Sequence, residues 1–177
     1  MKLLPTPSQT VGPYLHIGLT WLTIDRLVPA DFSGESVTID GQVLDGDRQP
    51  VTDALLEIWQ ANATGQFGQA DFPGFGRLPT DGAGQFRFTT IKPGPVADPE
   101  GRQQAPHLLV SIFMRGLLKR LVSRIYFPDD PRNAADYVLR QVAANRVHTL
   151  IARHTGPGKL QWNVLLQGAD ETVFFDC

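Results

Sequence analysis

Short runs of alternating apolar and polar residues, separated by turns rich in glycine and proline, constrain the fold of this chain most strongly. The clearest run begins at Ser36, places Val37, Ile39 and Val43 on one face, and ends in a turn at 45–50. Six to eight strands of this kind with little helix predict an all-β protein, a β-sandwich. Beyond residues 36–44 we expect strands at 54–61, 84–91, 107–114, 117–127, 160–167 and 172–175, with a loop at 62–83.

Two segments depart from the strand pattern. Residues 1–35 carry four prolines and no sustained periodicity, so they are expected to form an extended arm that lies on a surface. Asp130 followed by Pro131 predicts the start of a short helical insertion, and a second helix is expected from Asn145 to about His154. The two tryptophans within predicted strands, Trp59 and Trp162, are expected in the core.

Composition limits the possible classes of protein. A chain of 177 residues that is 42% hydrophobic is long enough for one well-buried core. A formal net charge of -2 argues against nucleic acid as a partner. We see no apolar run long enough for a signal peptide or a membrane span, so a cytoplasmic protein that does not contact the membrane is expected. The single cysteine, Cys177, allows no internal disulfide.

The four histidines and three tyrosines are the candidate metal ligands of this chain. The four histidines have no spacing that places two of them on one face of a strand. His148 and His154 would point about 240° apart on a helix, at roughly 100° per residue. For His107, an imidazole bonded to the backbone is the more common arrangement. A self-sufficient metalloenzyme is therefore disfavoured.

Several motifs together resemble those of the intradiol ring-cleaving dioxygenases. The most informative is 89–95, Thr-Thr-Ile-Lys-Pro-Gly-Pro, followed twelve residues later by His107. The resemblance covers most of the chain, with order and spacing preserved throughout. The other matching segments are 9–14 (QTVGPY), 41–43 (GQV), 56–62 (LEIWQAN), 113–116 (FMRG), 124–127 (RIYF) and 168–176 (GADETVFFD). It implies a mixed β-sandwich core.

The resemblance also indicates what this chain lacks. Family members hold non-haem Fe(III) with two tyrosines and two histidines, one Tyr directly after Lys-Pro-Gly-Pro and the histidines as a His-x-His pair. Here Val96 follows the turn, and the pair reads His107-Leu108-Leu109. The loop 63–77, where the other tyrosine would stand, contains only phenylalanines as aromatic residues. No metal is therefore expected in this chain, and Fe(III) is expected in a partner.

The resemblance implies an alpha subunit that pairs with an iron-bearing beta subunit as a hetero-oligomer. The pair would cleave protocatechuate with O2 to 3-carboxy-cis,cis-muconate. Residues 1–35 would form the arm that packs on the partner, and 36–177 the dioxygenase-like sandwich. Family members place arm residues and one strand-end arginine at the partner's substrate pocket; here these are Thr10, Gly12, Pro13, Tyr14 and Arg115. No residue of this chain is expected to be catalytic.

Taken by themselves these residues are less specific. A Gly-Pro pair such as Gly12-Pro13 is usually only a turn, and a strand-end arginine such as Arg115 is usually solvated. Residues 41–45 with 49–51 also resemble the opening of transthyretin-like carrier modules. A stand-alone binding or structural β-sandwich is therefore the alternative function, although such a module has little use for a Pro-punctuated arm.

Overall fold

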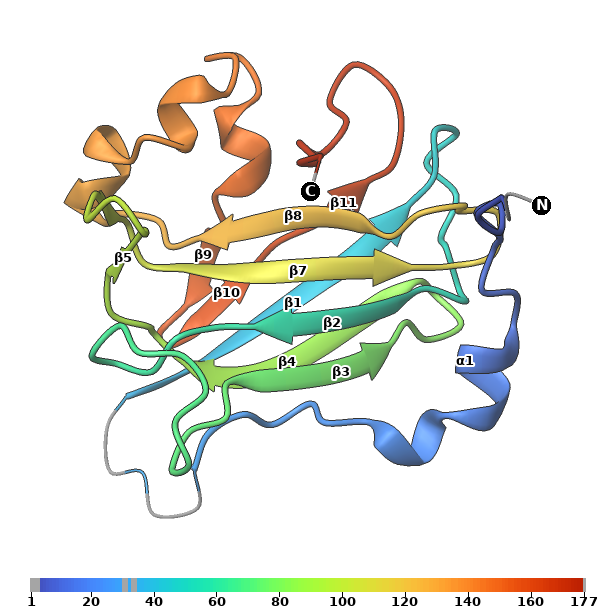
Figure 1. The fold of residues 1–177 in the computed structure, drawn as a ribbon, viewed down its shortest axis with the longest axis horizontal. Helices are drawn as coiled ribbons and strands as arrows, with labels where there is room; N and C mark the ends of the chain where they lie inside the picture. The colour runs from blue at the N-terminus through green and yellow to red at the C-terminus, as the bar shows by residue number, and fades with distance from the viewer. Residues whose placement is uncertain (1–3, 30–31, 33–34, 177) are drawn as a thin grey trace.

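The computed structural model describes residues 4–29, 32 and 35–176. Two β-sheets pack face to face, with a helical insertion at one end and the N-terminal arm around the other end and along one edge (Figure 1). None of the helices among the described residues is long and apolar enough to cross a membrane. The strands are β1 Ser36–Leu44, β2 Leu55–Trp59, β3 Phe75–Pro79, β4 Gln85–Ile91, β5 Val96–Ala97, β6 Gln103–Gln104, β7 His107–Phe113, β8 Leu121–Tyr126, β9 Arg153–Gly156, β10 Lys159–Gln161 and β11 Val164–Leu165.

Both sheets are built from segments distant in the sequence. One sheet has the order β3-β2-β7-β8 and is antiparallel throughout. In the other, β1 pairs antiparallel with β4 and parallel with β10 and β11, while β9 extends the sheet beyond β10. The predicted mixed, all-β architecture is therefore confirmed.

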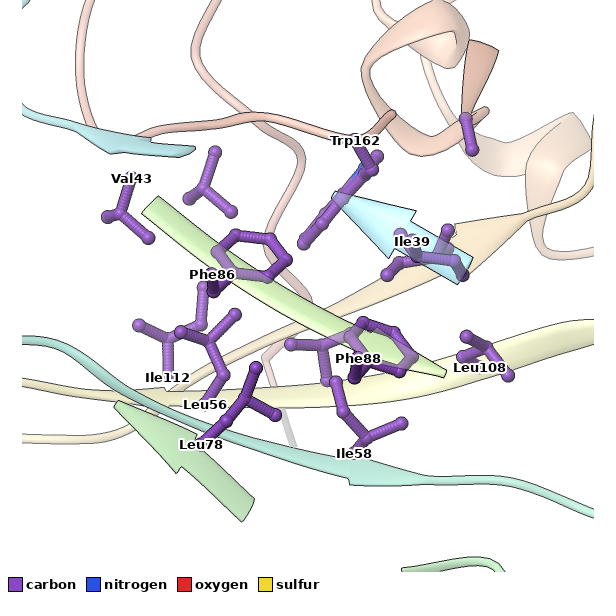
Figure 2. Packing of buried hydrophobic residues seen from close by; sticks show 14 of the residues in the cluster. Ile39, Val43, Leu56, Ile58, Leu78, Phe86, Phe88, Leu108, Ile112 and Trp162 are labelled. Atoms are coloured by element: carbon purple, nitrogen blue, oxygen red, sulfur yellow. The ribbon is translucent and has the colours of Figure 1, made fainter. Parts of the chain in front are cut away.

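The core lies between the two sheets. Ile39 and Val43 from β1 are fully buried, as their alternation predicted, and Phe86 and Phe88 from β4 lie beside them (Figure 2). Each large apolar side chain withdrawn from water in this way contributes roughly 1.5–3 kcal/mol. Trp162 is buried, as predicted, and its indole N–H donates to the Thr149 carbonyl at 2.9 Å.

The arm is not uniformly extended. It contains a one-turn helix, α1, at Tyr14–Gly18 and a 3-10 turn, η1, at Thr20–Leu22. Beyond these turns it lies along its own sheets, since Ile24 bridges to Arg77 in β3 and Arg26 bridges to Thr89 in β4. Leu27 is buried in the core. The boundary at residue 36 stays a prediction, although β1 begins there.

Four expectations about single elements are wrong. The strand expected at 160–167 is broken into the short strands β10 and β11. The segment 62–83 is not all loop, because β3 occupies Phe75–Pro79. The second helix is only the 3-10 turn η4 at Val147–Leu150, and Arg153–Gly156 forms β9 instead. No strand forms at 172–175, where the Thr172 N–H donates to the Leu165 carbonyl and the Phe175 N–H to the Val122 carbonyl. The insertion begins as predicted, with Asp130 capping η2 at Pro131–Ala135, and continues through η3 at Leu139–Gln141.

Candidate functional site

The arm and the β7–β8 turn meet at one end of the sandwich. Thr10 Oγ1 accepts a hydrogen bond from the Gly116 N–H at 2.9 Å and lies 3.5 Å from the Gly12 nitrogen. Gln9 and Val11 of the arm line a small hollow with Phe113, Met114 and the turn that follows. Two predicted site segments are thus brought together, since Thr10 and Gly116 are 106 residues apart in the sequence.

The rest of the predicted arm motif continues away from this contact. Gly12 has φ +65°, a conformation that favours glycine, and Pro13 follows as the residue before helix α1. The ring of Tyr14 lies against Gly18, and the residue is 66% exposed. Among the described residues no hydrogen bond joins Gly12, Pro13 or Tyr14 to Arg115, and Pro13 and Tyr14 are exposed.

Arg115 lies at the exposed turn after β7, where the strand pattern placed it. Its Nε donates to Asp53 Oδ2, and the two side chains are 62% and 17% exposed. The bond at Nε leaves the two terminal nitrogens without a partner among the described residues, and these can grip a carboxylate in bidentate fashion. Asp53 was missed, because no sequence signal links an acidic residue before β2 to a turn 62 residues later.

The Lys-Pro-Gly-Pro motif is hydrogen-bonded to the loop that follows β2. The Gly94 N–H donates to the Asn62 carbonyl at 2.9 Å, and Asn62 Oδ1 accepts from the Thr64 and Gln66 backbone N–H groups. Buried Gln60 joins β2 to β4 through the Ile91 carbonyl at 3.1 Å and the Thr90 hydroxyl. The motif residues Gln60 and Asn62 therefore shape this end of the sheet rather than carrying chemistry.

His107 opens β7 and is buried. Its Nδ1 lies 2.8 Å from the Ala105 carbonyl, so this nitrogen carries the proton and donates it. Burial, with a further contribution from the Arg124 guanidinium, lowers the pKa of His107 to about 4. The imidazole is therefore neutral at pH 7, and the predicted bond to the backbone is confirmed.

Around His107 lies a polar network on the outer face of β7 and β8. Leu109, at the second position of the expected His-x-His pair, is in register with Arg124, and His107 is in register with Tyr126. Arg124 Nη1 donates to Gln104 Oε1 at 2.7 Å and to the Tyr126 hydroxyl at 3.1 Å. The Tyr126 hydroxyl lies 3.3 Å from Asp136 Oδ1, and burial raises the pKa of this phenol above its usual range.

Comparisons with known proteins identify relatives along nearly the whole chain. Residues 23–168 match the family model described as Dioxygenase. The protocatechuate 3,4-dioxygenase alpha chain of Burkholderia cepacia is 41% identical over 97% of this chain and 96% of its own. The alpha chain of Pseudomonas putida is 39% identical over 99% and 98%. The beta chain of Burkholderia cepacia is 35% identical over 93% of this chain and 77% of its own.

Solved structures show the same fold. The dioxygenase domain of a carbohydrate-binding fusion protein from Streptomyces sp. SirexAA-E is 29% identical and superposes with a TM-score of 0.67, over 94% of this chain and 100% of that one. Catechol 1,2-dioxygenase from Pseudomonas arvilla C-1 is 23% identical with a TM-score of 0.64.

Intradiol dioxygenases use iron, and the residues around His107 do not fit that metal. Ferric iron needs several hard, anionic ligands. Here Leu109 and Val96 offer no donor atom, Arg124 places a cation beside His107, and the Tyr126 phenol is held protonated. Among the described residues no three His, Cys, Asp or Glu side chains converge to hold a metal.

The polar network thus lies at His107 and Leu109, the two positions at which the His-x-His motif predicts iron ligands in iron-binding family members. The family match covers more than two thirds of the chain, and the fold and the full-length relatives agree with it. The chain belongs to the intradiol ring-cleavage dioxygenase family.

Proposed function

We propose that this chain is the alpha subunit of a protocatechuate 3,4-dioxygenase, paired with a beta subunit that holds the Fe(III). The main support is that the chain matches an alpha chain over 97% of its length, while its described residues bring together no ligand set for iron. The complex would open the ring of protocatechuate between its two hydroxyl groups with O2. The product would be 3-carboxy-cis,cis-muconate, within the beta-ketoadipate pathway, and a cytoplasmic location belongs to the same proposal.

The contribution of this chain is to complete the partner's substrate pocket. The arm motif Thr10, Gly12, Pro13 and Tyr14 and the turn residue Arg115 are the proposed contacts. Support comes from the bond between Thr10 and Gly116, which fixes the arm beside the Arg115 turn, and from the exposed terminal nitrogens of Arg115. A guanidinium there can pair with the carboxylate that distinguishes protocatechuate from catechol.

Kinetics of an Arg115→Ala variant test this role. A hydrogen bond between charged groups is worth about 1.5–3 kcal/mol, so kcat/KM for protocatechuate should fall roughly ten- to hundredfold in the assembled enzyme. Iron content and assembly should not change, and catechol turnover should fall much less. The matched control is Arg153→Ala, which removes another exposed arginine, from β9. Equal losses on both substrates would contradict a carboxylate contact at Arg115.

A further inference from the structure

A second place in the chain has the features of a small-molecule site. A cavity of about 520 Å³ lies between the outer face of β7 and β8, the helical insertion and the C-terminal segment. Its walls are mainly apolar, with Leu109 and Val122 from the sheet, Val138 and Val142 from the insertion, and Phe175 from the C-terminal segment. Pockets for small organic ligands usually have volumes of about 300–1,000 Å³ and apolar walls with a few polar groups.

One of those polar groups is Arg124, a half-buried cation that forms no direct ion pair with the described residues and reaches the buried Asp136 carboxylate only through the Tyr126 hydroxyl. Its bonds go to neutral acceptors, the Gln104 side-chain carbonyl and the Tyr126 hydroxyl, and its guanidinium lies 5.7 Å from the centre of the Phe175 ring. No carboxylate of the described residues lies within ion-pair distance of it. A partly desolvated charge in this state costs free energy that a bound anion would offset.

The second polar group is Arg146, on the insertion side of the cavity. Its Nη2 bonds to the Glu171 carbonyl at 2.7 Å and reaches the Glu171 carboxylate at 3.4 Å, which leaves part of the guanidinium unused. Its Nε is buried and has no hydrogen-bond partner among the described residues. Asp176 is the carboxylate that lines the cavity, and it pairs with neither arginine. Arg124, Arg146 and Asp176 therefore line the cavity together, and of the two arginines only Arg146 has an ion pair, with Glu171.

We propose that this cavity binds a small monocarboxylate with a flat, apolar body, such as an aromatic acid. The carboxylate would pair with the free nitrogens of Arg124, within reach of Arg146, and the body would lie among the valines and the Phe175 ring. Leu109 lies four residues before the end of β7 at Phe113, about 13 Å at ~3.3 Å per residue, and Arg115 follows in the turn beyond that end. A ligand in this cavity would therefore not be the one that Arg115 meets.

Equilibrium dialysis with labelled benzoate tests the site. The protein is the full chain, copurified with the subunit that it assembles with, so that the readout is binding and not activity. Arg124→Gln should remove one equivalent of bound benzoate per chain, or weaken its binding roughly ten- to hundredfold. Val142→Trp, which fills the cavity and leaves both arginines in place, should cause the same loss. Arg153→Gln, an exposed arginine on β9, is the control that should lose nothing.

The uncharged analogue benzamide separates charge recognition from apolar binding, because it has the same shape. It should not bind at the Arg124-dependent site, and equal binding of both compounds would overturn the proposal. Unchanged benzoate binding in both Arg124→Gln and Val142→Trp would overturn it as well. If the chain alone binds benzoate but the complex does not, a side chain of the partner fills the cavity on assembly. That result would reject a small-molecule site. Since turnover is not measured, failure of the proposed function would not affect these outcomes.

Discussion

Protonation of His107 should lower the stability of the chain. In the folded chain its pKa is about 4, against an ordinary value of 6.5, because the charged imidazole would be buried beside Arg124. Between these two values the unfolded chain binds more protons than the folded chain. The free energy of unfolding therefore rises with pH across this window, and the contribution of His107 is lost as pH falls from 6.5 toward 4.

His107→Gln should remove this pH dependence. Across about 2.5 pH units the wild-type protein should lose up to about 3 kcal/mol relative to the variant, at about 1.4 kcal/mol per unit. Thermal unfolding between pH 4.5 and 7 measures the difference. His148→Gln, at an exposed position, is the control and should leave the wild-type slope intact. Parallel curves for wild type and His107→Gln would show that His107 titrates normally in the folded chain.

Single residues were predicted well where their immediate neighbours decide their environment. The backbone bond of His107 is local, with Ala105 only two residues away, and the sequence predicted it. Trp59 was expected in the core, which is wrong, since it is 39% exposed. It stands on the outer face of β2 and stacks on Phe67 with ring centroids 5.9 Å apart. Both faces of β2 carry apolar residues, so periodicity could not distinguish the inner face from the outer one.

The two loops at the ends of β2 and β4 are in close backbone contact. A Cβ atom at Gly94 would lie 2.6 Å from both the Ala63 carbonyl oxygen and the Gly65 nitrogen. These are backbone atoms, so the neighbouring loop must shift as a whole to make room. The close approach explains why the turn between Pro93 and Pro95 carries glycine.

Gly94→Ala should therefore destabilise the protein by roughly 1–3 kcal/mol, as overpacking of a tight contact usually does. Urea unfolding measures this cost. Gly82→Ala is the matched control, because its added Cβ would meet no heavy atom within 4 Å. It should change stability by no more than about 0.5 kcal/mol. Equal stability of the two variants would mean that the loops separate easily.

Elements with clear alternation were predicted, whereas those that depend on tertiary pairing were not. β1 was predicted at its observed bounds, 36–44. β3 was missed because its sequence, Phe-Gly-Arg-Leu-Pro, is weakly strand-forming and follows Pro73-Gly74. It exists because β2 pairs with it along five residues. The segment 172–175 is apolar enough for a strand but makes only a single backbone bond to β8.

At the scale of the whole molecule, the arm presents apolar side chains to solvent. Tyr14, Ile17 and Trp21 are 66%, 73% and 76% exposed, all within the two short turns of the arm. Clustered exposure of this kind is typical of a surface that a partner covers. It agrees with the proposed assembly with a beta chain.

Replacement of Ile17 and Trp21 together by lysine should therefore weaken assembly with the beta chain at least tenfold, since each apolar group contributes about 1.5–3 kcal/mol when buried. Sedimentation velocity of the copurified complex over a dilution series measures dissociation. Thr20→Lys adds a charge at an exposed position of the same arm and serves as the control. Dissociation curves that coincide for all three proteins would exclude the arm as a main contact.

The number of iron atoms per alpha–beta pair tests the central claim most directly, because it depends on whether this chain binds iron. Metal analysis of the copurified complex, reconstituted with excess iron and then freed of loosely bound metal, gives that number. We expect one iron per pair, held by the beta chain, because Leu109, Val96 and Arg124 leave no ligand set around His107. Two tightly held iron atoms per pair would contradict the account.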